Sequence, residues 1–208
     1  MNVKTLAKLT LFGLAYIYMA KLIDTIYQGI FTPAVIAGMV VGLNIIAGLV
    51  QLLFFIVLFQ QFVPEDKPAL KVASWLAIIG SGIGLLPKLL AMAVLFQLQP
   101  LFFFIRYRAQ ITAFCPWLTA VLLLAFSLTF FFNFGFRRDK PLKRAFAAGT
   151  AGWFVMAAAQ SLVIINYVTA GRLVWVADLF VAGPIVFVTV SSLTFLGLSV
   201  FYLTFACR

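Results

Sequence analysis

Six long apolar stretches occupy almost the whole of this 208-residue chain, and they constrain its fold more than any other feature. A helix that crosses a lipid bilayer needs about 20 largely apolar residues, and each stretch reaches that length. The connections are short, as in PEDKP at residues 64–68 and RRDKPLKR at 137–144. The sequence therefore predicts an all-α integral membrane protein, a six-helix transmembrane bundle that forms a single polytopic domain over 1–208. The expected spans cover approximately residues 6–28, 34–62, 69–98, 109–136, 145–169 and 174–205.

The composition excludes a water-soluble globule and several classes of site. Hydrophobic residues make up 65% of the chain and charged residues 10%, whereas soluble domains carry about 25% charged residues. No polar stretch is long enough to form a nucleic-acid surface. The chain has no histidine and only two cysteines, which argues against bis-histidine haem, His-rich metal sites and Cys clusters. We expect no cofactor and no bound metal.

The distribution of Lys and Arg predicts the orientation, because cytoplasmic loops are enriched in positive charge. A cytoplasmic N-terminus puts ten basic residues inside and four outside, with Lys88 left in the membrane. We therefore expect both termini to be cytoplasmic and the basic loops to face anionic lipid. The expected location is a bacterial inner membrane or a plasma membrane. The inside group is Lys4, Lys8, Lys67, Lys71, Arg137, Arg138, Lys140, Lys143, Arg144 and Arg208, and the outside group is Lys21, Arg106, Arg108 and Arg172.

Pro87 and Lys88 interrupt the third apolar stretch, in GSGIGLLPKLLAM at residues 80–92. Proline removes a helical hydrogen bond and bends a helix, so we expect one kinked span. A hairpin at this point would leave backbone groups unpaired near lipid. At about 1.5 Å per residue, Lys88 lies roughly 26 Å beyond Lys71 and close to the outer boundary. One interpretation is that its side chain snorkels to the head groups.

The other interpretation makes Lys88 part of a polar site. Asp24 and Asp178 are expected at a similar depth, near the outer ends of the first and last spans. Together the three charges could form the mouth of a solute site. The two aspartates stand in no motif that would position a catalytic pair, so we do not expect an enzyme.

Amide side chains within the spans are further candidates for ligand binding. Asn44 and Gln51 are seven residues apart with Gly48 between them, which puts all three on one helical face. Gln160 is expected near the middle of the fifth span. Amides in lipid face the bundle interior, where they either bond to other helices or line a polar site.

Small residues at four-residue spacing predict close helix packing, within the bundle or between subunits. They occur in the second, third and fifth spans, and the packing residues expected from them are Gly38, Gly42, Gly80, Gly84 and Gly152.

Two functions from different classes fit these features. The leading hypothesis is a small membrane protein that binds or transports a small solute or lipid within its helix bundle. The alternative is a non-catalytic structural or accessory subunit that docks onto a larger homo- or hetero-oligomeric membrane complex. In size and number of spans the chain is similar to the substrate-capture subunits of energy-coupling-factor transporters, a likeness of architecture alone.

Overall fold

The computed structural model describes residues 2–27, 34–63, 66–96, 107–133, 139–169 and 183–207. Within these ranges all regular secondary structure is helical. Six helical stretches are long and apolar enough to cross a membrane, with α3 and α4 together forming one of them, which confirms the all-helical, six-span part of the prediction. The helices are α1 Val3–Tyr27, α2 Ala34–Phe62, α3 Pro68–Ile83, α4 Leu86–Leu95, α6 Arg108–Asn133, α7 Lys140–Val168 and α9 Gly183–Cys207.

The helix boundaries differ from the predicted spans mainly at α7. This helix begins at Lys140, whereas the sequence predicted a connection as far as residue 144. The earlier start has a local cause: the Asp139 carboxylate accepts a hydrogen bond of 3.2 Å from the Leu142 amide, and a proline occupies the first turn. The basic segment is therefore partly helical. Residues 174–182 of the sixth predicted span lie outside the described part of the chain.

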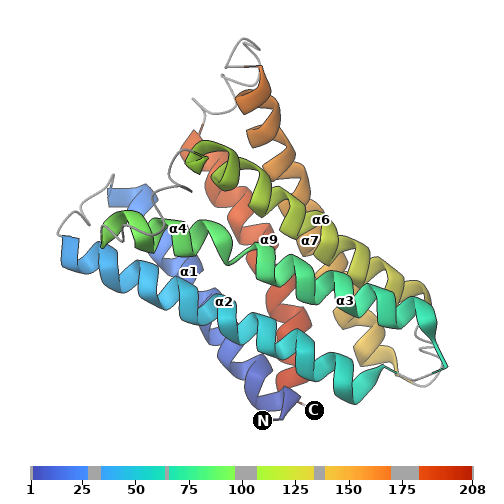
Figure 1. Ribbon diagram of the computed structural model, residues 1–208. Coiled ribbons are helices and arrows are strands. Elements are labelled where there is room, and N and C mark those ends of the chain that lie inside the picture. Colours follow the sequence, from blue (N-terminus) through green and yellow to red (C-terminus); the bar gives the residue numbers. More distant parts are fainter. Residues whose placement is uncertain are drawn as a thin grey trace.

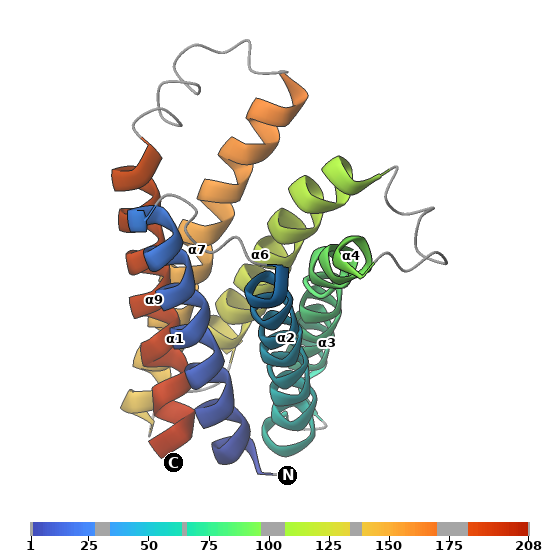
Figure 2. The same cartoon turned by 90° about the vertical axis from the view of Figure 1, so that its left-hand side faces the viewer.

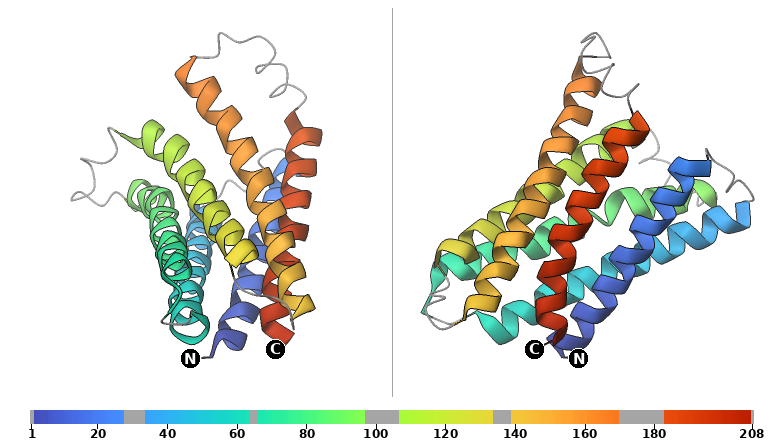
Figure 3. Two further views of the ribbon diagram at one scale, coloured as in Figure 1. Left: turned by 90° about the vertical axis from the view of Figure 1, so that its right-hand side faces the viewer. Right: turned by 180° about the vertical axis from the view of Figure 1, so that it is seen from behind.

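The helices form a closed ring in chain order. Each span packs against the spans before and after it, and α9 closes the ring by packing against α1. Figure 1 shows that the N- and C-termini lie at the same end of the bundle. Away from that end, α7 and α9 diverge from α2, α3 and α6, as Figure 2 and the left view of Figure 3 show.

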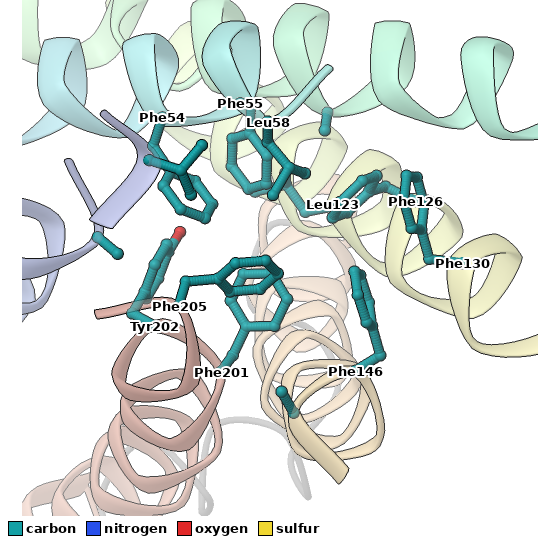
Figure 4. Packing of buried hydrophobic residues seen from close by; sticks show 14 of the residues in the cluster. Phe54, Phe55, Leu58, Leu123, Phe126, Phe130, Phe146, Phe201, Tyr202 and Phe205 are labelled. Atoms are coloured by element: carbon teal, nitrogen blue, oxygen red, sulfur yellow. The ribbon is translucent and has the colours of Figure 1, made fainter. Parts of the chain in front are cut away.

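Among the described residues, the main cluster of the hydrophobic core lies toward the end of the ring where the termini lie. Its centre is a set of side chains that we call the aromatic cluster, contributed by α2, α6, α7 and α9 (Figure 4). The rings of Phe130 and Phe146 stack with centroids 5.0 Å apart, and most other pairs meet edge to face, the arrangement that aromatic quadrupoles favour. The cluster consists of Phe54, Phe55, Phe126, Phe130, Phe146, Phe201, Tyr202 and Phe205.

Glycines bring several helix pairs into close contact. The backbones of α7 and α9 come close together, since a Cβ on Gly197 would lie 2.9 Å from the Gly152 Cα. Gly80 and Gly84 face Thr119 of α6, and Gly38 faces Leu95 of α4. No described atom lies within 4 Å of where a Cβ on Gly42 would be, so a side chain added there would meet open space.

Candidate functional site: a polar cavity inside the helix ring

A small cavity of about 30 Å³ lies inside the ring, at the border of the hydrophobic core. Five helices contribute to its wall: α1, α2, α4, α7 and α9. A water molecule needs at least about 10–15 Å³, so the cavity can hold a small polar group. Its lining residues are Thr10, Leu14, Ile17, Ala47, Gln51, Lys88, Trp153, Leu198 and Tyr202.

Two buried polar atoms in this wall have no hydrogen-bond partner among the described residues. They are the indole Nε1 of Trp153 and the hydroxyl of Tyr202, whose side chains are 3% and 1% exposed. Figure 4 shows the Tyr202 hydroxyl at the edge of the aromatic cluster, beside Phe54. An unsatisfied buried polar group costs about 1–3 kcal/mol, and both of these residues belong to the lining of one cavity.

The other polar groups of the wall are an amide, a hydroxyl and an ammonium group. The Gln51 side chain lies near the Tyr202 hydroxyl, but the two do not meet the geometry of a hydrogen bond. The Thr10 hydroxyl donates a bond of 2.8 Å to the Leu6 carbonyl of its own helix. The polar part of the wall therefore combines satisfied and unsatisfied groups.

A break in the third span positions Lys88. Gly84 and Leu85 form a turn between α3 and α4, in which the Leu85 amide donates to the Gly82 carbonyl at 3.1 Å. Pro87 follows in the first turn of α4, where it cannot donate a backbone bond and its ring would clash with the Ile83 carbonyl. The interruption expected near Pro87 is present. It lies about one turn before Pro87, because the proline ring would clash with the carbonyl of Ile83, the last residue of α3.

The Lys88 ammonium group lies against α2. Its Nζ is 2.9 Å from the position that a Cβ on Gly48 would occupy, and the side chain is half-buried and lines the cavity. Because Gly48 has no side chain, α2 leaves room for the amino group at this level. The side chain thus points into the bundle, in contrast to the snorkelling interpretation. Lys88 also takes part in an interaction within the chain.

The structure brings two of the predicted ligand-binding residues together and leaves the others apart. Gln51 and Lys88 both line the cavity. Asn44 and Gln160 are half-buried and do not belong to its described lining. The side chain of Asp24 and the whole of Asp178 lie outside the described part of the chain, so a cluster of these acids with Lys88 stays a prediction.

Sequence reasoning missed Trp153, Tyr202 and Thr10. Aromatic residues in membrane helices are common at both interfaces, and nothing in the sequence separates these two from the rest. Residue spacing could have connected one of them to its neighbour in the cavity wall: Leu198 and Tyr202 are four residues apart and therefore share a helix face. The described residues contain no group of three or more potential metal ligands.

Comparison of the chain with known protein families, with curated proteins and with solved structures found no match.

Proposed function

We propose that this chain is a multi-pass membrane protein that binds a small solute or a lipid group within its helix bundle, as a small transporter or the binding component of one. The observation that carries the proposal is the pair of unpartnered buried polar atoms, Trp153 Nε1 and the Tyr202 hydroxyl, at a cavity that Gln51 and Lys88 also line. Buried polar groups in native proteins almost always have a partner, and exceptions at a shared cavity favour a ligand.

The placement of the cavity supports the same function. The hydrophobic core closes the ring at the end where the termini lie, and the helices diverge at the other end (Figure 2). Five helices line the cavity, and one of them, α4, follows a break in its span. Broken helices near a central site are typical of transporters. A ligand here would contact helices from both sides of the ring at once.

The proposed setting is a bacterial inner membrane or plasma membrane with both termini in the cytoplasm. The Lys and Arg distribution supports this orientation, because ten basic residues then lie on the cytoplasmic side. These residues would contact anionic lipid head groups.

Native mass spectrometry of the chain purified in a mild detergent tests the proposal. We expect a small molecule to stay bound to the wild type and to be lost from Ile17→Phe, which adds bulk to the cavity wall. The matched control is Met19→Phe, because Met19 is 50% exposed on the same helix and outside the cavity lining. A stoichiometric protein partner with no retained small molecule would overturn the proposal and favour the accessory-subunit alternative.

A further inference from the structure

We infer that the group bound in this cavity is an oxyanion, a carboxylate or a phosphate. This inference rests on the proposed function, since it names the chemical class of the ligand. The described part of the wall contains no carboxylate, and two of its polar groups, the Trp153 indole and the Lys88 ammonium, can only donate hydrogen bonds.

The hydrogen-bonding capacity of the wall requires a ligand that accepts. The Trp153 indole can be satisfied only by an acceptor, and the Tyr202 hydroxyl and the Gln51 amide can donate to the same group. The Thr10 hydroxyl already donates to its own helix. A carboxylate or phosphate has several acceptor oxygens in a small volume, so one such group can accept from several of these donors.

The charge at the wall selects an anion over a neutral acceptor. The Lys88 ammonium lies at the cavity against the backbone of α2, in surroundings where charge interactions are much stronger than in water. The ammonium group would repel a cation and attract an anion, whereas a neutral carbonyl would gain only a hydrogen bond from it. Since Lys88 also interacts within the chain, an anion would either share or replace that interaction.

The remaining wall is apolar and suits hydrocarbon attached to the anion. Leu14, Ile17, Ala47 and Leu198 supply this part. The volume of about 30 Å³ limits what is enclosed to a small head. The same oxyanion chemistry is found in anionic lipids and in free anions, so the experiment must distinguish the two sources.

Trp153 provides a built-in reporter for the test. We would replace Trp75, Trp117 and Trp175 with Phe, so that the emission comes from Trp153 alone, and place the protein in phosphatidylcholine nanodiscs. Four compounds are then added in separate experiments. Three are anionic, namely phosphatidylglycerol in the bilayer, laurate and inorganic phosphate, and the fourth, monolaurin, is neutral. A saturable change of emission is expected with the anionic additions and not with monolaurin. A response to inorganic phosphate equal to that of laurate would identify a free anion as the source, and a response to laurate or phosphatidylglycerol alone would identify a lipid.

Substitutions at Lys88 and Tyr202 complete the design. Lys88→Met should weaken binding roughly 10- to 100-fold, the usual effect of losing a hydrogen bond to a charged group. Lys88→Arg, which keeps the charge, should retain most of the binding, and Tyr202→Phe should weaken it severalfold. Lys71→Met is the control, because Lys71 belongs to the same span and not to the cavity wall.

The outcomes separate this inference from the proposed function. An equal response to monolaurin, or unchanged binding in Lys88→Met, would overturn the oxyanion class. If native mass spectrometry still showed a molecule that Ile17→Phe expels, the proposed function would stand. If no molecule were retained and no addition changed the Trp153 emission, both the oxyanion inference and the proposed binding function would be wrong.

Discussion

At the scale of single residues, the polar groups of the cavity differ in how far the sequence identifies them. Gln51 and Lys88 could be predicted because an amide or a charge within an apolar span is costly and must serve a purpose. Trp153 and Tyr202 could not be, because an indole or a phenol is apolar enough to occur anywhere in a membrane helix. What distinguishes them is that no described residue forms a hydrogen bond with the indole Nε1 or the hydroxyl, and only the packed structure reveals that.

Two tyrosines give a matched test of this difference. The Tyr18 hydroxyl forms a hydrogen bond of 2.8 Å with Ser192 Oγ, whereas the Tyr202 hydroxyl has no hydrogen-bond partner within the described part of the chain. In protein stripped of bound lipid, Tyr18→Phe should lower the free energy of unfolding by about 0.5–1.5 kcal/mol. Tyr202→Phe should leave it unchanged or raise it by about 1 kcal/mol, because it removes an unsatisfied buried group.

Unfolding of both variants in mixed micelles, followed by fluorescence, measures the two free energies. The combination of improved stability and weakened ligand binding in Tyr202→Phe is the signature of a binding residue. A loss of stability as large as that of Tyr18→Phe would mean that the hydroxyl has a partner in the ligand-free protein.

At the scale of helices, the sequence predicts the number and approximate extent of the elements well and their contacts less well. The α2 boundaries match the predicted 34–62 because Pro33 and the PEDKP segment frame an uninterrupted apolar run. The predicted start of α7 was wrong, because a helix begins at its capping residue, here Asp139. The segment that follows Asp139 carries several charges, so the sequence did not identify it as part of a membrane span. Glycine spacing predicted close packing without naming the partner helices; Gly80 and Gly84 face α6 and Gly152 lies against α9, while a role of Gly42 between subunits stays a prediction.

Gly197 and Gly42 form a second matched pair, on helix packing. A Cβ on Gly197 would lie 2.7 Å from the Ala148 carbonyl oxygen, whereas one on Gly42 would meet nothing within 4 Å. Gly197→Ala should therefore separate α7 from α9 and cost about 1–3 kcal/mol, as overpacking does. Gly42→Ala should be neutral or add about 0.5–1 kcal/mol, since alanine is the better helix former.

The same unfolding measurement on both glycine variants checks these values. Destabilisation by Gly42→Ala comparable to that of Gly197→Ala would show that Gly42 packs against something else, such as a second copy of the chain. A stable Gly197→Ala would contradict the tight α7–α9 contact.

At the scale of the whole molecule, the closure of the ring could not be predicted. Apolar side chains cover α2 and α9 on all sides, and in lipid an apolar surface does not indicate which face turns inward. The order of the helices around the ring follows from short connections, but the place of the aromatic cluster depends on which Phe residues turn inward. The membrane orientation rests on the basic residues alone and is open to a direct test.

Two exposed positions, one before the third span and one after it, report on that orientation. Asp66 lies between α2 and α3, and Arg108 begins α6. In a background of Cys115→Ser and Cys207→Ser, we expect Arg108→Cys to react with an impermeant maleimide in intact cells. Asp66→Cys should react only after the membrane is opened, because the basic residues around it belong on the cytoplasmic side.

The pattern of labelling also tests the break at Pro87. With one bent span between residues 66 and 108, the two cysteines must lie on opposite sides, whichever way the protein is inserted. Reaction of both from the same side would require two crossings, and so a hairpin at Pro87 and Lys88. Lys88 would then lie at a membrane surface, where it could not reach the cavity wall, and the oxyanion site would lose its charge. If Asp66→Cys reacted in intact cells and Arg108→Cys only after the membrane is opened, the predicted orientation would be wrong. The single bent span and the cavity would be unaffected by that result.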